Sequence, residues 1–340
     1  MSSTAGRIWA ALGTVYLVWG STYLAIRWSI ETMPPMLSAA ARFLVAGALL
    51  AGWLRIKHGP AAFRVTSRQL RNATICGLLL LTGGNGMVVL AETHIPSGLA
   101  ALLVAAVPLW LVVLRRIVGE RVGAVTLAGV VVGLAGVALL LLPDGSGGPV
   151  SLGYSALVLV AALSWALGSL VSIRGDVPAN PAMMSAVEMF AGGLALTAIG
   201  GLRGEFGSVD LGAISAKSWL SLVYLVLFGS IVAFSCYVWV LGTAPTSLVA
   251  TYAYVNPAVA VALGALFAGE HLRSLELVGG LVILASVVVV VRAEAARRPA
   301  RPPGRTRRWP GRSARPGSAP DRSAATPSAP RPARPVDTRR

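Results

Sequence analysis

Ten long apolar runs constrain the fold of this chain more than any other feature. A bilayer core about 30 Å thick needs about 20 apolar residues in helical form, because lipid offers backbone polar groups no hydrogen-bond partner. The runs that meet this requirement are residues 8–30, 35–54, 72–92, 97–114, 123–142, 153–173, 181–202, 218–239, 248–268 and 276–291. Hydrophobic residues make up 55% of the chain and charged residues only 12%, which excludes a soluble globular domain. We therefore predict an all-α membrane protein with ten transmembrane helices.

The distribution of Lys and Arg predicts the orientation. If the N-terminus, residues 1–7, lies on one side of the membrane, that side carries 24 of the 29 Lys and Arg residues and the opposite side carries three. Cytoplasmic loops of membrane proteins carry the excess of Lys and Arg. We therefore expect a multi-pass protein of the cell membrane (inner or plasma membrane) with both termini in the cytoplasm.

The two halves of the chain resemble each other. LVWGS around Trp19 matches LSWAL around Trp165, PPMLS from Pro34 matches PAMMS from Pro181, and IPSGLAA from Ile95 matches APTSLVA from Ala244, all in the same order. This series indicates two copies of a five-helix unit.

We place the first repeat at residues 8–142 and the second at residues 151–292, with an external linker at 143–150. Because five is an odd number, the second repeat should enter the membrane upside down relative to the first. Inverted repeats are typical of secondary transporters, in which two halves open a site near the membrane midplane to alternate sides. The sequence therefore favours a transporter.

Several stretches resemble the EamA-type drug/metabolite transporter family, and within it the YedA-like inner-membrane permeases. They are WGSTYLAI from Trp19, PPMLSAAARF ending at Phe43, GGNGMVVLAE from Gly83, PSGLAALLVAAVPL from Pro96, the pair Gly119 and Glu120, and TYAYVNPAVAV from Thr251. The resemblance covers about residues 8–291. It implies ten helices in two inverted repeats, export of small metabolites or toxic analogues, and a central cavity built from the first four helices of each repeat. The fifth and tenth helices would then lie outside the cavity, as scaffold or as the contact surface of a homodimer.

Charges inside the apolar runs are candidate transport residues, because a charge at the centre of a lipid-exposed helix is costly. Glu188 lies in the seventh run, where a desolvated carboxyl suits a proton-linked carrier or a contact with a cationic substrate. The alternative is a structural carboxyl bonded to a neighbouring helix. Arg42 occupies the matching depth of the second run, and we expect a structural or gating role for it. We expect Arg27 to reach towards the membrane interface, and Glu92 and His94 to be solvated interface residues.

Polar and aromatic residues within the runs complete the predicted substrate pathway. Amide and phenol groups can bind a neutral or zwitterionic solute, and aromatic rings inside a span can line a cavity. The predicted pathway residues besides Glu188 are Trp19, Tyr23, Asn85, Trp165, Tyr252, Tyr254 and Asn256. Contacts between neighbouring helices and core packing are the alternative for these groups.

Two prolines and three glycines indicate close or broken helices. Pro108 and Pro257 are predicted to interrupt the fourth and ninth helices at matched positions, which in repeat transporters marks a midplane site. The alternative is that they only bend these helices. Gly129, Gly133 and Gly136 form one small-residue face on the fifth helix, which permits either a homodimer contact or an internal one.

Missing motifs exclude several other functions. Lys57 and Lys217 are the only lysines and neither follows a glycine, so the phosphate-binding motif of ATP-driven transporters is absent. The three histidines are scattered, Cys76 and Cys236 lie in apolar runs, and no acid, base or metal groups converge at one depth. We expect no enzyme activity, no metal and no cofactor. The predicted function is a secondary transporter that exports small metabolites, amino-acid-like compounds or drugs by alternating access, with proton coupling as an option; the alternative is a passive facilitator or channel for a small polar solute.

Residues 293–340 differ in composition from the rest of the chain. They carry 13 of the Arg residues and are rich in Pro, Ser and Ala, so they cannot bury a core and are predicted to form a disordered cytoplasmic tail. We expect the tail to associate with lipid or to have no role, and we expect no nucleic-acid partner. Truncation after Glu294 should therefore preserve transport.

Overall fold

The chain forms a bundle of helices in a computed structural model that describes residues 2–142, 151–244, 246–249 and 251–297. The described residues contain no strand, and the prediction of an all-α membrane protein is confirmed. In chain order the helices are α1 (Ser2–Ser29), α2 (Pro35–His58), η1 (Pro60–Phe63), α3 (Ser67–Gly77), η2 (Leu78–Gly86), α4 (Met87–Ala91), α5 (Ser97–Val104), α6 (Val107–Ile117), α7 (Ala124–Leu141), α8 (Leu152–Arg174), α9 (Pro181–Leu202), η3 (Glu205–Ser208), α10 (Ala216–Tyr224), η4 (Leu225–Val232), α11 (Ala233–Thr243), α12 (Thr246–Val249), α13 (Tyr252–Phe267) and α14 (Ser274–Arg297). The predicted linker, and the predicted tail beyond residue 297, lie outside the described residues.

Within this part of the chain, nine helices are long and apolar enough to cross a membrane. They span Thr4–Ser29, Pro35–His58, Ser67–Ala91, Ser97–Ile117, Ala124–Leu141, Leu152–Arg174, Pro181–Leu202, Ala216–Tyr237 and Ser274–Ala296. The predicted ninth helix is shorter, because the chain turns at Thr251 and divides it into α12 and α13. The ten predicted spans therefore correspond to nine long helices and one divided helix.

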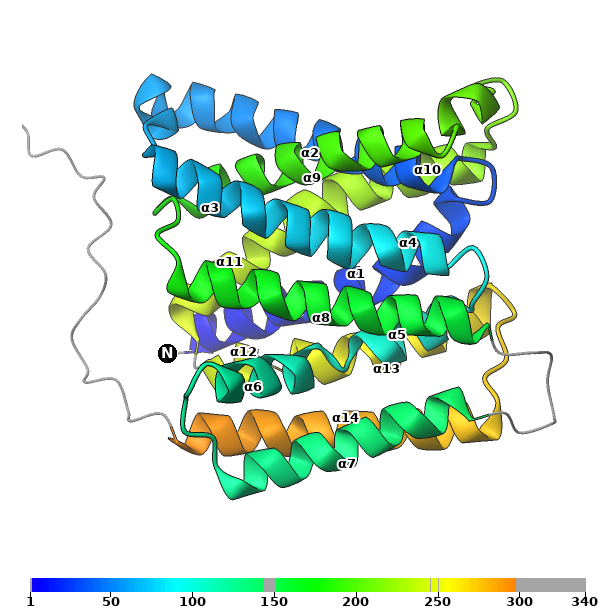
Figure 1. The fold of residues 1–340 in the computed structure, drawn as a ribbon. Helices are drawn as coiled ribbons and strands as arrows, with labels where there is room; N and C mark the ends of the chain where they lie inside the picture. The colour runs from blue at the N-terminus through cyan, green and yellow to red at the C-terminus, as the bar shows by residue number, and fades with distance from the viewer. Residues whose placement is uncertain (1, 143–150, 245, 250, 298–340) are drawn as a thin grey trace, which may run out of the picture. The chain divides into compact units, whose positions relative to one another are not determined.

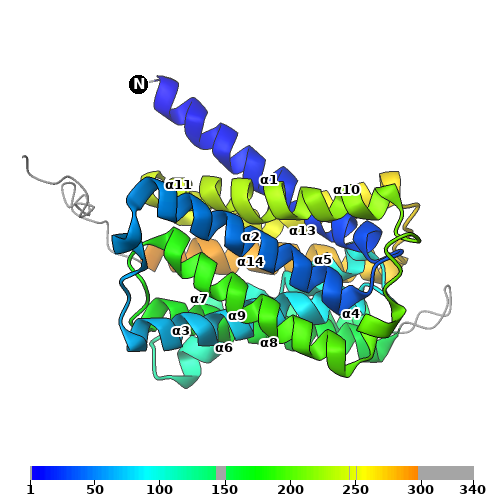
Figure 2. The same ribbon diagram turned by 90° about the horizontal axis from the view of Figure 1, so that it is seen from above.

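Helices from the two halves of the chain pack against each other in pairs. α2 lies along α9, α7 lies along α14, and α1 lies against α11 and α13, while α8 lies against η2 and α6 (Figures 1 and 2). In each of these pairs one helix comes from the first half and its partner from the second. The core therefore forms between the halves, and a site in this core is lined by both.

Matching local features recur in the two halves. The third span of each half contains a π-helical segment, η2 in the first and η4 in the second. Gly119 and Gly269, which each precede a glutamate, both adopt the left-handed backbone conformation, with φ of 87° and 61°. A side chain is unfavourable in that conformation, which explains a glycine at both positions. These features support the duplication seen in the sequence.

Capping residues set helix ends that the apolar pattern misplaced. The third span begins at Ser67 rather than at residue 72, because the Thr66 side chain accepts a hydrogen bond from Gln69 N at 3.1 Å and the Gln69 side chain accepts one from Thr66 N. α14 continues to Arg297, past the predicted end of the second repeat at residue 292. Its last turns are held by Glu294, whose carboxylate accepts hydrogen bonds from Arg115 (2.6 Å) and Thr126 (3.1 Å).

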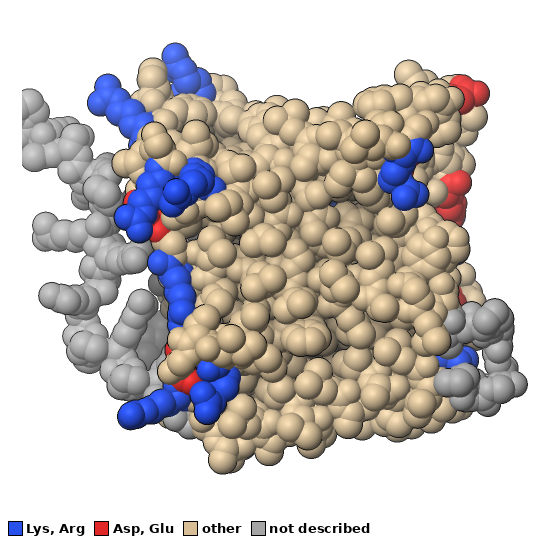
Figure 3. Space-filling model, in the orientation of Figure 1, with Lys and Arg blue, Asp and Glu red and all other residues tan. Residues whose placement is uncertain are grey.

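The surface of the bundle is apolar between two charged ends. Large apolar side chains in the middle of the spans, such as Leu17, Val131 and Leu194, are 63%, 68% and 61% exposed. In Figure 3 the Lys and Arg side chains gather at the edge where α2 ends and α3 begins, and the surface between the two edges carries few charges. An apolar band of this kind is suited to contact with lipid rather than water.

The glycine face of α7 is an internal contact. A Cβ at Gly136 would lie 3.0 Å from Gly279 O on α14, and a Cβ at Gly279 would lie 2.8 Å from Gly136 O. Gly129 and Gly133 likewise face Val290 and Ser286 on α14. The absence of side chains at these glycines lets the two backbones approach closely.

Gly279→Val should destabilise the protein by about 1–3 kcal/mol, because the added side chain forces α7 and α14 apart. The measurement is thermal unfolding of the purified full-length protein in detergent. Gly52→Val is the control, because nothing lies within 4 Å of a Cβ at Gly52. Equal unfolding temperatures for the two variants would contradict the close contact.

Candidate functional site

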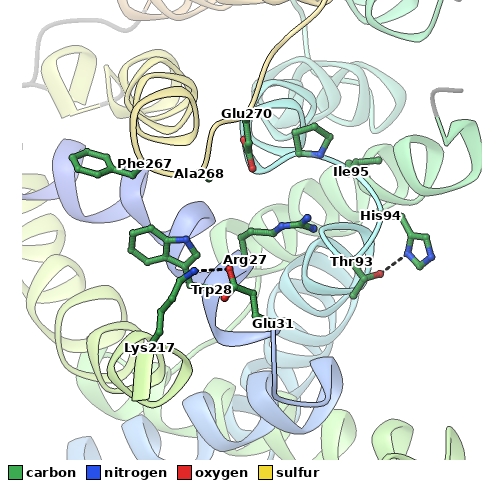
Figure 4. Close-up of a pocket in the computed structure, with 11 residues that line it drawn as sticks. Arg27, Trp28, Glu31, Thr93, His94, Ile95, Lys217, Phe267, Ala268 and Glu270 are labelled. Atoms are coloured by element: carbon green, nitrogen blue, oxygen red, sulfur yellow. Dashed lines mark hydrogen bonds and ion pairs between the residues drawn. The ribbon is translucent and has the colours of Figure 1, made fainter. Parts of the chain in front are cut away.

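A cavity of about 520 Å³ lies between the two halves, at the end of the bundle where α1 ends (Figure 4). Its size is typical of a site for a small molecule. The residues that line it are Arg27, Trp28, Glu31, Thr93, His94, Ile95, Pro96, Lys217, Phe267, Ala268 and Glu270. They come from the last turns of α1, the turn between α4 and α5, the first turn of α10, and the end of α13 with the turn that follows it.

Glu270 connects the turn after α13 to the start of α5. Its carboxylate accepts hydrogen bonds from Ser97 N (2.8 Å), Gly98 N (3.0 Å) and the Ser97 hydroxyl (3.0 Å). The first N–H groups of a helix have no partner within the helix, and a carboxylate at this position satisfies them. One wall of the cavity is therefore fixed by a contact between the two halves of the chain.

The cavity presents both signs of charge. Lys217 donates to Glu31 at 2.7 Å and lies 5.1 Å from the centre of the Trp28 ring, so these two charges largely neutralise each other. Arg27 donates one guanidinium nitrogen to the backbone oxygen of Glu92 and forms no ion pair with a carboxylate among the described residues. The remaining donors of Arg27 are the groups in this cavity best suited to an incoming anion.

Three aromatic rings from three helices lie deeper along α1. The centre of the Trp19 ring lies 5.2 Å from that of Tyr237 and 5.4 Å from that of Tyr252, and the two tyrosines are 5.6 Å apart. The Trp19 indole donates to Gly229 O at 3.1 Å. We call these three residues the aromatic cluster. Further along α1 the Tyr16 hydroxyl forms a short hydrogen bond with Thr251, so the helices beyond the cavity are held in contact.

The structure brings some predicted pathway residues together and separates others. Trp19 and Tyr252 belong to the aromatic cluster, and Tyr23 lies between this cluster and Arg27 on α1. Asn256 is buried and its side-chain oxygen has no hydrogen-bond partner among the described residues. The predicted pathway residues do not themselves line the cavity.

The other predicted residues lie on different helices. Asn85 is on η2, where its side-chain oxygen also has no partner among the described residues, and Trp165 packs against Gly84 of the same segment. Tyr254 packs against the apolar core around α5 and α6. Glu188 lies on α9, where its backbone approaches Gly77 of α3 so closely that a Cβ at Gly77 would lie 2.4 Å from Glu188 O.

Arg42 is buried on α2. Its Nε donates to the Ser230 hydroxyl at 3.1 Å and its guanidinium carbon lies 5.0 Å from the centre of the Phe43 ring. Its Nη1 has no hydrogen-bond partner among the described residues. The partner that the sequence left unknown is therefore in part the hydroxyl of η4.

The expectation of a solvated Glu92 is wrong. Glu92 is 0% exposed, because the turn after α4 folds inward and Arg27 binds its backbone oxygen. His94, two residues further on, is exposed and stacks on Tyr154 with ring centres 3.9 Å apart. Arg27 also differs from the expectation, since it lines the cavity rather than extending to the interface.

The two prolines differ in their effects. A turn at Ala105 and Ala106, directly before Pro108 enters the first turn of α6, separates α5 from α6, although the two together form one helix long enough to cross a membrane. Pro257 lies inside α13, and the helix continues through it. The division of the ninth span comes earlier, at Thr251.

At the opposite end of the bundle a second glutamate binds arginines. Glu120, the residue matched to Glu270, accepts hydrogen bonds from Arg115 Nε and Arg174 Nη2, each at 2.5 Å. These hydrogen bonds, from Arg174 first and Arg115 next, lower the pKa of Glu120 below its ordinary value. Arg115 also binds Glu294 of α14, so this ion cluster joins three segments of the two halves.

Sequence reasoning missed several cavity residues because they lie at the ends of the apolar runs. Glu31, Thr93, Lys217, Phe267 and Glu270 are separated by loops in the sequence and converge only in the fold. One signal was available for Glu270: it follows a glycine at the position matched to Glu120. Tyr237 of the aromatic cluster carries no comparable signal.

Comparison with known proteins identifies the class of this fold and cavity as a membrane transporter. The EamA-like transporter family matches residues 5–142 and 152–292, and the chain belongs to this family. The uncharacterized inner membrane transporter YedA of Escherichia coli (strain K12) is 39% identical over 289 residues, which cover 84% of this chain and 90% of that protein. A probable amino-acid metabolite efflux pump of Salmonella typhimurium is 28% identical over 305 residues, or 85% of this chain and 96% of that pump.

One solved crystal structure shares the fold. It superposes with a TM-score of 0.58 at 21% sequence identity and covers 85% of this chain and 98% of its own. The suggested family resemblance is confirmed, and the chain is a multi-pass membrane transporter.

Glu270→Ala should destabilise the protein by about 1–3 kcal/mol, because it leaves the first N–H groups of α5 without an acceptor. Glu31→Ala is the control, since it breaks a half-exposed ion pair worth about 0–1 kcal/mol. Thermal unfolding in detergent measures both. A smaller loss for Glu270→Ala than for Glu31→Ala would contradict the proposed importance of the capping contact.

Proposed function

We propose that this protein is a secondary transporter that exports amino-acid-like metabolites or drugs by alternating access between two inverted five-helix repeats. The observation that carries this proposal is the cavity between the two halves, with Arg27 on its wall. The similarity to an amino-acid metabolite efflux pump supports the substrate class. The excess of Lys and Arg on the side of the N-terminus supports an orientation with both termini in the cytoplasm, which makes the cavity open to the outside.

The groups in the cavity fit a zwitterion with an apolar side chain. Arg27 can bind a carboxylate with two donors, Glu31 and Glu270 can attract an ammonium group, and Trp28 and Phe267 offer apolar surface. A solute that lacks the carboxylate would leave the remaining donors of Arg27 without an acceptor, whereas Glu31 and Glu270 already accept hydrogen bonds from Lys217 and from the start of α5. Recognition of the carboxylate by Arg27 is therefore the proposed chemical basis of selectivity.

The contrast between Glu120 and Glu270 supports alternating access. Glu270 caps the start of α5, whereas Glu120 binds Arg115 and Arg174. If the two repeats exchange conformations, Glu120 would cap the start of α12 and Glu270 would bind Arg27, which occupies the place in α1 that Arg174 occupies in α8. The structure then corresponds to one of two related states, and each glutamate has one partner in each state.

A homodimer through the fifth and tenth helices, α7 and α14, remains part of the proposal. Their glycine faces are occupied by each other, so a second copy would contact their outward faces, which expose Val131, Val132 and Leu281. Lipid is the alternative occupant of these faces.

Arg27→Gln should weaken binding of L-phenylalanine roughly 10- to 100-fold, because a charge-assisted hydrogen bond to its carboxylate is worth about 1.5–3 kcal/mol. The measurement is binding to purified protein by calorimetry, with phenethylamine and phenylpropionate as analogues that lack one charge. Arg203→Gln is the control variant, since Arg203 pairs with Glu205 and does not line the cavity. The proposal requires that the wild-type protein in proteoliposomes accumulate radiolabelled L-phenylalanine against its gradient, while equilibration in both directions without accumulation would favour a passive facilitator.

Glu120→Gln should increase the population of the exchanged state, because it removes the ion pairs at the inner end while the Gln side-chain oxygen can still accept hydrogen bonds from the start of α12. The readout is the reaction rate of a hydrophilic maleimide with Thr251→Cys, in a protein whose two native cysteines are replaced by alanine. A partly exposed ion pair contributes about 0–1 kcal/mol, so we expect labelling up to about five-fold faster. Asp176→Asn is the control: Asp176 accepts from Gln69 at the same end of the bundle but lies outside the ion cluster. Labelling that is unchanged or slower in Glu120→Gln would argue against a role of this cluster in closing the inner end.

A further inference from the structure

Glu92 is a buried carboxyl group that the fold leaves without a partner. It follows the last residue of α4, is 0% exposed, and neither of its carboxylate oxygens has a hydrogen-bond partner among the described residues. Burying an ionised carboxylate without hydrogen bonds is strongly unfavourable, and such a group binds a proton instead. Its neighbours Thr93 and His94 line the cavity, so Glu92 lies directly behind the cavity wall.

Charged and titratable groups from three other segments act on Glu92. They are Tyr23 and Arg27 on α1, Arg42 on α2, and Glu270 after α13. Burial, and after it the charge of Glu270, raises the pKa of Glu92 well above its ordinary value, while Arg27 and Arg42 oppose this rise. Neither arginine binds the carboxylate, because Arg27 donates to the backbone oxygen of Glu92 and Arg42 donates to Ser230.

Arg42 also lacks a partner on one side. Its Nη1 is buried with no hydrogen bond among the described residues, and a cavity of about 10 Å³, the size of about one water molecule, lies beside Arg42. The structure thus contains a buried acid and a buried cation that interact electrostatically, each with unsatisfied hydrogen-bonding atoms. An ion pair between them would satisfy both, but only after the acid has lost its proton.

We propose that Glu92 is the proton-binding site of this transporter, which gives its proton to water in the cavity and, once ionised, pairs with Arg42. This inference rests on the proposed function, because it assigns the coupling ion and its site to that transport cycle. The O–H bond of the carboxyl breaks, the proton leaves as hydronium, and the carboxylate takes the free Nη1 donor of Arg42. Reprotonation from the other side of the membrane breaks this pair and restores the structure described above.

The position of Glu188 sets it apart from this role. It lies on α9 beside α3, neither it nor its sequence neighbours line the cavity, and no arginine of the described residues is bonded to it. Glu188 is therefore the matched control: a second carboxyl within the bundle that lacks both the cavity and the waiting cation.

Infrared spectroscopy of the full-length protein in lipid tests the site without any substrate. In the wild type, the carbonyl stretch of a protonated carboxyl should persist at a pH at which exposed carboxyls are ionised. Glu92→Gln should lose the part of this component that belongs to Glu92, Glu92→Asp should keep that part at a shifted frequency, and Glu188→Gln should leave it in place. Arg42→Gln should move its midpoint to higher pH, because the cation that favours the ionised form is gone, whereas Arg115→Gln should leave it unchanged. Identical spectra for the wild type and Glu92→Gln, or an unshifted midpoint in Arg42→Gln, would overturn the proposal.

The transport assay separates this inference from the proposed function. In proteoliposomes, accumulation of L-phenylalanine driven by an imposed pH gradient should be lost in Glu92→Gln, while exchange of labelled for unlabelled L-phenylalanine continues. Gradient-driven accumulation that survives in Glu92→Gln would refute the coupling role even if the wild type transports. If the wild type shows the infrared component but no flux of any kind, the proposed transport function fails and the proton-binding site stands.

Discussion

The structure depends on the rule that a polar group removed from water must find its partner inside the protein. In the bundle this rule applies first to the backbone, which forms helices, and then to the ends of helices that are themselves buried. Glu270 meets it at the start of α5 by accepting from two backbone N–H groups and one hydroxyl. The same rule makes the exceptions informative: Glu92, Arg42 and Asn256 carry buried polar atoms that have no hydrogen-bond partner within the described part of the chain. A transporter needs such groups, because a polar group whose hydrogen bonds are already complete in one conformation does not favour a change to another conformation.

The fold was largely predictable because lipid imposes a simple requirement on each span. Long apolar runs predict helices wherever they occur, and nine of the ten runs are long helices in the described part of the chain. The errors in the predicted spans lie at the helix ends, because capping side chains determine where a helix begins and ends. Thr66 and Gln69 start a helix five residues before the apolar run begins, and Glu294 holds the last turns of α14 through Arg115, a residue from the other half. A contact such as that between Glu294 and Arg115 joins residues far apart in the sequence, so no local sequence pattern predicts it.

The candidate site was less predictable than the fold, because it is formed by residues that are distant in the sequence and come together only in the folded protein. A search for polar and aromatic residues in the middle of spans selects Trp19 and Tyr252, which the structure places in contact, but it cannot show that Tyr237 completes their cluster. It overlooks the cavity wall, since Arg27, Lys217 and Glu270 look like ordinary charges at the ends of helices. It also misjudges Glu92, because whether a residue at the end of a span meets water or protein depends on how the following turn folds.

The π-helical segments η2 and η4 determine which way the outer parts of their spans face. Carbonyl oxygens of these wide turns accept hydrogen bonds from the opposite half: Leu79 O from Ser164, and Gly229 O from the Trp19 indole. A surplus residue in a helix rotates everything beyond it by about 100° relative to a regular α-helix. Without the wide turns of η2, the carboxyl of Glu92 would lie at a different angle around the helix axis, and its position relative to Arg42 would change. The irregular hydrogen bonding of η2 thus sets the orientation of Glu92 around the helix axis, and with it the position of this acid relative to Arg42.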